Sequence, residues 1–306
     1  MQQHDDQIRA AAIAYVQERA RAAGGVVSRA DLEAFTFRGQ RLPLIERQRG
    51  IRKVAGLDAA LTILTAYAPD PERRPYDDGV GPDGYLRYRW RGTDPAAFDN
   101  RALRAAMVEG RPLIWLWGVA PATFHPIAPV FLVAEEPEHH RFVVAIDEES
   151  RRQWELLEQA SPHPADLAIR RIYVEERTLR RVHQPVFRLR VLSAYGRRCA
   201  LCRLRHPELL EAAHIRPDAE GGEPVVPNGI AMCAIHHRAF DAHVVGIRPD
   251  HRVEIRGDVL AERDGPTLRH ALQGIHGAVI ELPKRPRDHP DPELLEERYE
   301  RFRAAG

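Results

Sequence analysis

The sequence predicts an α+β protein of two domains that are joined by a helical connector. Short apolar runs separated by turn residues, which are typical of strands, fill the stretch from 35 to 142. Residues 148–182 are highly charged and lack the alternation of a strand. Beyond residue 185 the three cysteines of the chain fall in one window beside histidines, which indicates a separately organised second domain.

Length and composition exclude several classes of protein. A chain of 306 residues exceeds the usual size of one domain, and 44% hydrophobic with 29% charged residues is ordinary for a globular protein. The N-terminus lacks a signal-peptide pattern and no apolar run is long enough to span a bilayer, so we expect a cytoplasmic protein without a membrane partner. The net charge is only +1, but nearly all cations are Arg, the better bidentate phosphate ligand. Genomic base composition would produce the same bias.

The N-terminal part, residues 1–150, is predicted to be a mixed domain of strands with a few helices. Apolar residues at helical spacing stop at a Gly-Gly pair, and Ser28 followed by Asp31 is typical of a helix cap. We expect helices over 6–23, 57–67 and 100–108, a short helix after Ser28, and strands over 113–117 and 130–133.

The remaining chain is predicted to hold a helical connector and a second domain. The connector covers 151–184 and the domain 185–306. Within this domain we expect a helix over 186–195 and a strand over 252–256. Asp291-Pro292 supplies an N-cap and a first-turn proline, so a charged helix closes the chain.

Two pairs of metal-binding residue types stand about 30 residues apart. Cys199 and Cys202 form a Cys-x2-Cys knuckle, and Cys233 with His236 forms the second pair. Zinc favours four such thiolate and imidazole ligands in a closed tetrahedral site. We therefore predict a structural zinc. The alternatives are three buried free cysteines, or His236 as an additional catalytic ligand.

The segment from Glu211 to Asp241 resembles the HNH branch of the ββα-metal nucleases. In that family a strand carries a His, a loop carries an Asn, and a helix carries a His nine residues after the Asn; Asn228 and His237 keep this spacing. The resemblance implies a ββα-metal fold and an endonuclease that hydrolyses phosphodiester bonds of double-stranded DNA. The broader run from 183 to 250 resembles the HNH region of restriction endonucleases.

The resemblance also implies roles for the signature residues. His214 would be the general base, Asn228 would orient the loop, and His237 would hold a catalytic divalent metal such as Mg²⁺ or Mn²⁺. The residue before the base is often a metal ligand in the family, but here it is Ala213. Asp241 lies four residues after His237 on the expected helix, so it is the predicted replacement. The alternative for Asp241 is that it caps the helix or pairs with an Arg. Separately, the alternative for His214 is a packed histidine at the end of a strand.

The region from 75 to 117 is similar to an SRA domain, the flipped-base reader of modified cytosine, which implies an SRA/PUA-like fold. Tyr76 and Tyr88 keep the family's twelve-residue spacing, and Asp78 lies in the acidic turn between them. Two aromatic faces and a hydrogen-bonding carboxylate are what a flipped base requires. The three tryptophans of this region are expected in the core. The alternative is a sheet domain that binds ordinary duplex DNA or a partner protein.

Together these features predict a modification-dependent restriction enzyme. The alternatives are an HNH nuclease without modification sensing and a non-catalytic HNH protein that binds DNA. One HNH site cuts one strand, so a homodimer formed through the connector would supply the two sites of a double-strand break.

Overall fold

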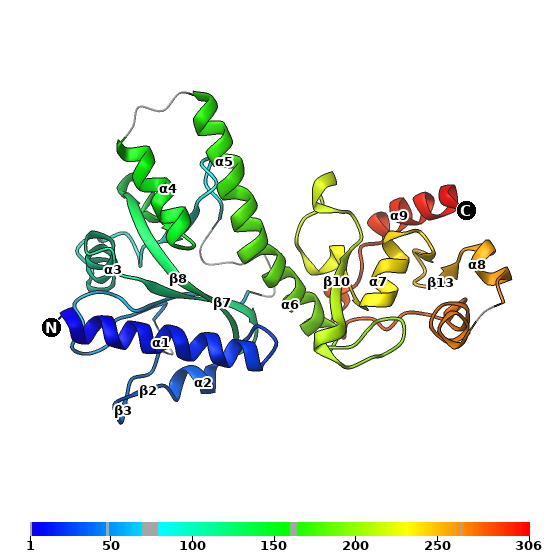
Figure 1. Ribbon diagram of the computed structural model, residues 1–306, viewed down its shortest axis with the longest axis horizontal. Helices are drawn as coiled ribbons and strands as arrows, with labels where there is room; N and C mark the ends of the chain where they lie inside the picture. Colours follow the sequence, from blue (N-terminus) through cyan, green and yellow to red (C-terminus); the bar gives the residue numbers. More distant parts are fainter. Residues whose placement is uncertain (1, 47–48, 69–78, 160–163, 264) are drawn as a thin grey trace. The chain divides into compact units, whose positions relative to one another are not determined.

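The structure is a computed structural model that describes residues 2–46, 49–68, 79–159, 164–263 and 265–306. The chain divides into two compact units, Met1–Pro185 and Val186–Gly306 (Figure 1). The first is built on a curled mixed sheet, and the second on short hairpins and helices. The predicted α+β class is therefore confirmed.

The sheet of the N-terminal unit has seven strands. Its order is β4-β5-β7-β8-β9-β6, with β1 added to β8; β5 and β7 are parallel and the other pairs antiparallel. The bounds are β1 Val27–Ser28, β4 Ile51–Arg52, β5 Thr62–Thr65, β6 Leu86–Arg89, β7 Leu113–Ala120, β8 Thr123–Glu136 and β9 Arg141–Ala145. A small separate hairpin pairs β2 Thr36–Phe37 with β3 Gln40–Arg41. The strands expected over 113–117 and 130–133 are parts of β7 and β8, which form a long hairpin.

Helices cover this sheet. Their bounds are α1 Gln2–Ala22, α2 Arg29–Glu33, α3 Phe98–Val108, α4 Glu148–Gln159 and α5 Pro164–Thr178, the last continued by a π-helical turn Leu179–His183. Helices α1 and α4 both pack on β8, and Figure 1 shows them on opposite sides of it. Ser28 and Asp31 form the capping box of α2, as the sequence predicted.

The helix predicted over 57–67 is wrong, because this stretch contains β5 instead. Thr62, Ile63 and Thr65 are β-branched residues, which lose less side-chain freedom in a strand than in a helix. Ile63 lies opposite Trp115 in the parallel pair β5–β7, and Leu61 and Ile63 are fully buried. A strand buried on both faces shows no alternation, so its apolar run was mistaken for a helical one.

The segment predicted as a connector is helical, and its helices pack on the N-terminal unit. The hydroxyl of Tyr85 donates to the carbonyl oxygen of Ser150 on α4 at 2.9 Å. On α5, Val174 is buried with Phe131 and Val143 of the sheet. These helices therefore share the core of the first unit.

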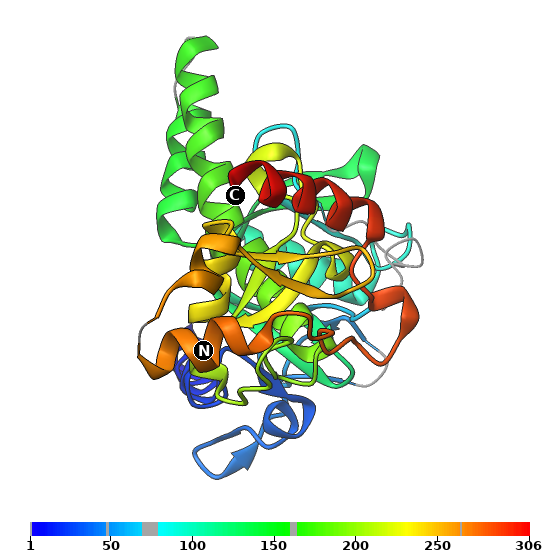
Figure 2. The same cartoon turned by 90° about the vertical axis from the view of Figure 1, so that its right-hand side faces the viewer.

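The C-terminal unit contains two short hairpins and several helices. The bounds are α6 Gln184–Ala194, β10 Leu210–His214, β11 Gly229–Cys233, α7 Ala234–Asp241, β12 Val245–Ile247, β13 Val253–Ile255, α8 Gly257–Ala261 and α9 Pro292–Ala305. Asp291 caps α9 through Glu293 N and Leu294 N, as predicted. Figure 2 shows α9 lying over the hairpin β12–β13. Among the helices of the described residues, none combines the length and apolarity needed to cross a bilayer.

Asp147, at the end of β9, is expected to make the stability of the N-terminal unit pH-dependent. Burial alone would raise the pKa of its carboxyl, but hydrogen bonds from Ser150 N and from the guanidinium groups of Arg177 and Arg181 lower it to about 2. Since the folded pKa lies below the unfolded one, the stabilisation is complete above about pH 4 and disappears as the pH falls through about 2.

We expect Asp147→Asn to reduce the free energy of unfolding by about 2 kcal/mol at pH 7. Urea denaturation followed by tryptophan fluorescence measures this, because all four tryptophans lie in the first unit. The difference from the wild type should narrow towards zero at about pH 2. Asp58→Asn, which changes an exposed carboxylate, is the control. If Asp147→Asn reduced the free energy of unfolding equally at pH 7 and at about pH 2, the Asp147 carboxylate would not be the source of the pH dependence.

Candidate active site and metal centre

The signature residues lie on one ββα unit. Strands β10 and β11 pair antiparallel, with His214 opposite Gly229, and α7 begins directly after Cys233 at the end of β11. The strand, the loop and the helix that the sequence predicted thus form one hairpin and its following helix. The hairpin brings His214 at the end of the first strand beside the start of the second.

His214 is packed against an aromatic ring of α6. Its imidazole stacks on Phe187 with a centroid distance of 4.0 Å and an interplanar angle of 13°. A Cβ on Gly229 would lie 2.7 Å from the Phe187 ring, so only glycine leaves room for this stack. His214 Nε2 lies 3.4 Å from Asp218 Oδ1. Burial lowers the pKa of His214, and the Asp218 carboxylate partly opposes this shift.

Asn228 is 1% exposed and clamps the loop between the two strands. Its Oδ1 accepts from Arg216 N at 2.8 Å, and its Nδ2 donates to the carbonyl oxygens of Arg216 and Glu223 at 3.0 and 2.9 Å. Gly222 passes so close that a Cβ there would lie 1.9 Å from the Arg216 oxygen. Asn228 therefore fixes the backbone that follows His214.

His237, on α7, lies between two carboxylates. Its Nδ1 hydrogen bonds to Glu211 Oε2 of β10, and its Nε2 lies 3.3 Å from Asp241 Oδ2, one turn along the helix. The sequence analysis did not single out Glu211. The available signal was its position two residues before Ala213, because residues i and i+2 of a strand share a face. Glu211 thus offers a carboxylate near the family's usual ligand position.

Asp241 also contacts an arginine, as the alternative interpretation expected. Arg298 Nη2 of α9 lies 3.5 Å from Asp241 Oδ1 and donates to the carbonyl oxygen of Phe240 at 3.1 Å. Further ion pairs join α9 to the loop of Asn228, namely Arg216 with Glu297 and Arg301 with Glu220. Helix α9 therefore braces both the helix and the loop of the site.

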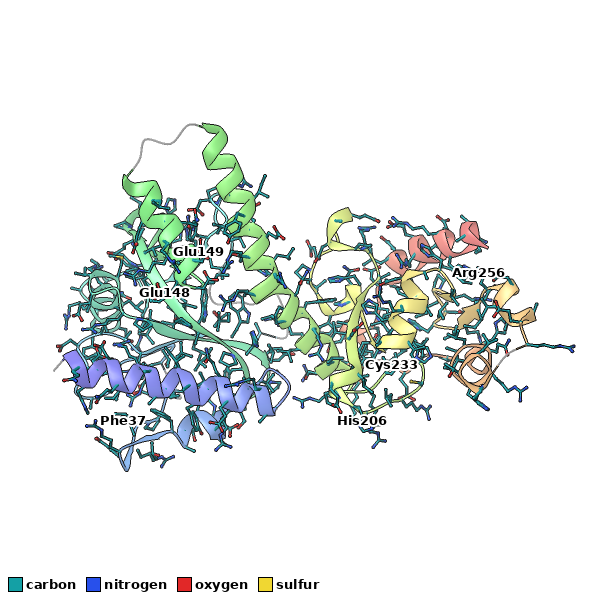
Figure 3. The ribbon with its side chains drawn as sticks, in the orientation of Figure 1. Phe37, Glu148, Glu149, His206, Cys233 and Arg256 are labelled. Carbon is teal, nitrogen blue, oxygen red and sulfur yellow. The ribbon has the colours of Figure 1, made fainter. Side chains whose placement is uncertain are left out.

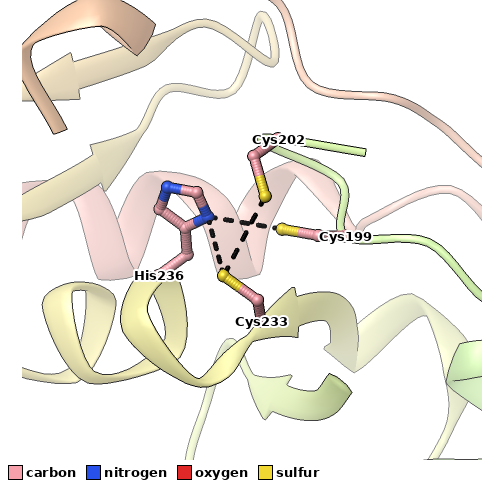
Figure 4. Close-up of side chains that lie close together, drawn as sticks. All are labelled: Cys199, Cys202, Cys233 and His236. Carbon is pink, nitrogen blue, oxygen red and sulfur yellow. Dashed lines mark hydrogen bonds between the residues drawn. The ribbon is translucent and has the colours of Figure 1, made fainter. Parts of the chain in front are cut away.

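Cys199, Cys202, Cys233 and His236 come together, as the sequence predicted (Figure 4). Their ligand atoms all lie within 4.8 Å of one another. His236 Nδ1 is 3.4 Å from Cys199 Sγ and 3.2 Å from Cys233 Sγ, and Cys202 Sγ is 4.0 Å from Cys233 Sγ. Ligands about 2.3 Å from a tetrahedral zinc would be roughly 3.8 Å apart. The donor set and its spacing therefore fit zinc.

The second nitrogen of His236 has its own partner, which decides the tautomer. His236 Nε2 lies 2.7 Å from the carbonyl oxygen of Ala271, which can only accept, so Nε2 carries the proton. Nδ1 is then free to bind a metal, in the arrangement typical of metal-ligating histidines. Figure 3 labels Cys233, which is buried in this unit, and His206, whose side chain is exposed.

Of the three residues predicted to bind a base, the structure describes only Tyr88. Tyr76 and Asp78 lie outside the described residues. Tyr88, on β6, is 5% exposed; its hydroxyl donates to the carbonyl oxygen of Gly50 at 3.1 Å, and its ring packs edge-on against Trp115. Trp90, Trp115 and Trp117 are buried, as expected. A base-binding role for these residues remains a prediction.

The segment that carries the site matches a known protein family. Residues 199–248 match the family model described as HNH endonuclease, which confirms the resemblance of this segment. A search of curated protein sequences gives no match. The modification-dependent TagI restriction endonuclease is 17% identical, with a TM-score of 0.27 over 82% of this chain and 84% of that one. The Type IV phosphorothioation-dependent restriction endonuclease ScoMcrA is 16% identical, with a TM-score of 0.26 over 84% of this chain and 55% of that one.

Replacing one cluster residue should remove the bound metal. We expect Cys202→Ser and His236→Ala to lower the zinc content from one ion per chain to nearly none and to destabilise the C-terminal unit, because zinc binding and folding are coupled. Elemental analysis with thermal unfolding measures both effects. His237→Ala is the matched control, since this imidazole faces Glu211 and Asp241 instead. Zinc lost in His237→Ala but kept in His236→Ala would reverse the two assignments.

Proposed function

We propose that this protein is a metal-dependent endonuclease that hydrolyses phosphodiester bonds of double-stranded DNA. The observation that carries this proposal is the ββα unit, which brings His214, Asn228, His237 and Asp241 together in the HNH segment. Such a reaction needs a base for the attacking water and neutralisation of charge on the phosphate. The residues of this unit offer both.

His214 is the proposed general base. Burial lowers its pKa, so the imidazole is neutral and able to accept a proton at physiological pH. The stack on Phe187 fixes the plane of the ring, and the Asn228 clamp fixes the backbone that follows it. Proton transfer requires this orientation, because the accepting nitrogen must lie within hydrogen-bonding distance of the water.

His237 and Asp241 are the proposed ligands of the catalytic cation. Two ligands of one Mg²⁺ or Mn²⁺ ion, each about 2.1 Å from it, lie roughly 3 Å apart, close to the 3.3 Å between His237 Nε2 and Asp241 Oδ2. Glu211 is the proposed orienting group, because it holds His237 Nδ1 and leaves Nε2 for the ion. A bound cation would neutralise charge on the phosphate and stabilise the leaving oxygen.

The N-terminal unit is the proposed reader of DNA modification, with an SRA-like pocket formed around Tyr76, Asp78 and Tyr88. HNH sites contact mainly the DNA backbone, so sequence or modification specificity requires an attached module. Trp117 lies beside Trp115, which packs on Tyr88, and its indole N–H, like those of Trp90 and Trp154, is buried without a hydrogen-bond partner in the described part of the chain. The neighbouring Trp115 instead donates to Thr65 at 2.8 Å. A flipped base would offer Trp117 an acceptor.

A second candidate function is an HNH nuclease that does not sense modification. The burial of Tyr88 favours it, because a ring packed on Trp115 with its hydroxyl on Gly50 has a complete set of structural contacts. In either case one site cuts one strand. A homodimer is therefore part of the proposal for double-strand cleavage.

Plasmid cleavage tests both candidates. With Mg²⁺ or Mn²⁺, we expect the wild type to cut DNA carrying methylated, hydroxymethylated or glucosylated cytosine and to spare plain DNA. His214→Ala should lose at least 100-fold in rate, because general-base catalysis contributes about 10²–10⁴-fold. Equal cleavage of all plasmids would favour the second candidate. If the zinc-loaded wild type cut none of the plasmids, the result would favour a non-catalytic HNH protein that binds DNA.

Asp241→Ala separates a metal ligand from a structural carboxylate. We expect the variant to keep its zinc but to bind Mn²⁺, measured by calorimetry, at least tenfold more weakly and to lose metal-dependent cleavage. Asp258→Ala is the matched control, because it removes an exposed carboxylate of the same unit that pairs with Arg256, and it should retain Mn²⁺ binding. Full Mn²⁺ affinity and activity in Asp241→Ala would show that Asp241 is not a ligand of the catalytic cation.

Glu211→Gln should weaken Mn²⁺ binding about 10–100-fold if Glu211 orients His237.

A further inference from the structure

Residues 281–291, here called the basic strap, run across the C-terminal unit and are fixed at both ends. Glu281 N donates to the carbonyl oxygen of Ala200 in the cysteine knuckle at 2.8 Å. Asp291 N donates to the carbonyl oxygen of Pro227, next to Asn228, at 3.0 Å. Figure 2 shows the strap as the orange-red segment that leads into α9. It therefore links the metal cluster with the loop of the candidate active site.

The strap is also held internally. Pro283 and Pro290 are buried, and the ring nitrogen Nε2 of His289 donates to the carbonyl oxygen of Pro283 at 2.9 Å. Residues Pro286–Asp288 form a 3₁₀ turn that packs on the turn Val226–Asn228. Prolines fix the backbone φ angle, so the strap presents its outer side chains from a nearly rigid loop.

Three cations project from this loop without a partner. Lys284, Arg285 and Arg287 are exposed, and within the described residues their side chains have neither a hydrogen bond nor an ion pair. The strap also contains three acids: Glu281 pairs with Arg203, Asp291 caps α9, and Asp288 forms no ion pair with the three cations within the described residues. Some arginines of the same unit have anionic or aromatic partners, among them Arg203, Arg216, Arg298, Arg301 and Arg303. Others, such as Arg263 and Arg269, have none within the described residues, but they do not lie on the strap.

Lys284, Arg285 and Arg287 hold three positive charges within four residues of a rigid loop, and the carboxylate of Asp288, which follows them, offsets their mutual repulsion only in part. The repulsion is relieved when an anionic partner with repeated charges lies across the loop. The phosphates of duplex DNA provide such a series, and arginine binds phosphate with two parallel hydrogen bonds. Because the 3₁₀ turn of the strap packs beside Asn228, phosphates bound there would lie close to the candidate site.

We propose that the basic strap is a binding surface for the backbone phosphates of duplex DNA, with Lys284, Arg285 and Arg287 as the contacting groups. This inference rests on the proposed nuclease function, because the duplex would then extend from the catalytic residues along the strap. The contacts are independent of base sequence, as backbone contacts are. They would fix the orientation of the duplex on the C-terminal unit.

Salt-dependent binding of the full-length, zinc-loaded chain tests the proposal. Affinity for a 30-base-pair duplex is measured between about 50 and 300 mM salt without added catalytic metal. Each phosphate contact contributes about 0.9 to the slope of log K against log[salt], so Arg285→Ala/Arg287→Ala should lower the slope by roughly 2. The affinity near 150 mM salt should fall roughly ten- to thirtyfold. Arg285→Lys/Arg287→Lys should keep most of the slope.

Arg263→Ala/Arg269→Ala is the matched control. These two arginines are also exposed and unpaired within the described residues, and their removal changes the net charge by the same amount. An unchanged slope in the strap variant, or an equal loss in the control pair, would overturn the role of the strap while wild-type cleavage persists. A wild type that neither binds nor cuts duplex DNA would instead overturn the proposed nuclease function.

Discussion

The pairing of β10 with β11 determines the geometry of the candidate site. In an antiparallel hairpin a slip of one residue turns every side chain to the opposite face, so the register that sets His214 against Gly229 also sets the direction of the imidazole. The missing side chain of Gly229 leaves space for Phe187 of α6, and Phe187 supports the ring of His214. The side chain of Asn228 then hydrogen bonds to the backbone of Arg216, which holds the loop between the two strands in this register.

Helix α7 contributes a histidine to the cysteine cluster and another to the candidate active site, because adjacent residues of a helix point in different directions, about 100° apart. His236 faces the cysteines and is 1% exposed, whereas His237 faces Glu211 and Asp241. A metal bound by the cysteine cluster would fix the first turn of α7 to the knuckle. Helix α9 holds the other end through Arg298. The position of His237 is therefore controlled from both ends of a short helix.

Charged side chains help to attach two helices of the N-terminal unit to the rest of that unit. Arg9 of α1 is 1% exposed; it binds Asp5 and donates to the carbonyl oxygen of Ala60 just before β5. Asp147, which follows β9, binds two arginines of the segment predicted as a connector. A buried charge left without a partner is strongly unfavourable, so the contacts of Arg9 and Asp147 favour one position for each helix. Two of the connector's many charged residues thus attach it to the first unit, whereas pairs such as Arg171 with Glu175 lie exposed along one helix.

The sequence by itself determined the features that depend on neighbours along the chain. The knuckle, the pair Cys233 and His236, the caps at Ser28 and Asp291, and the spacing from Asn228 to His237 could all be predicted, because local backbone geometry places residues a few positions apart. Only the tertiary structure decided which distant side chains meet. Glu211 reaches His237 across 26 positions and Glu297 reaches Arg216 across 81, and such contacts depend on the path of the chain between them. For the same reason β5 was mistaken for a helix, since its partner β7 lies about 50 residues away and burial on both faces removes the periodicity that marks a strand.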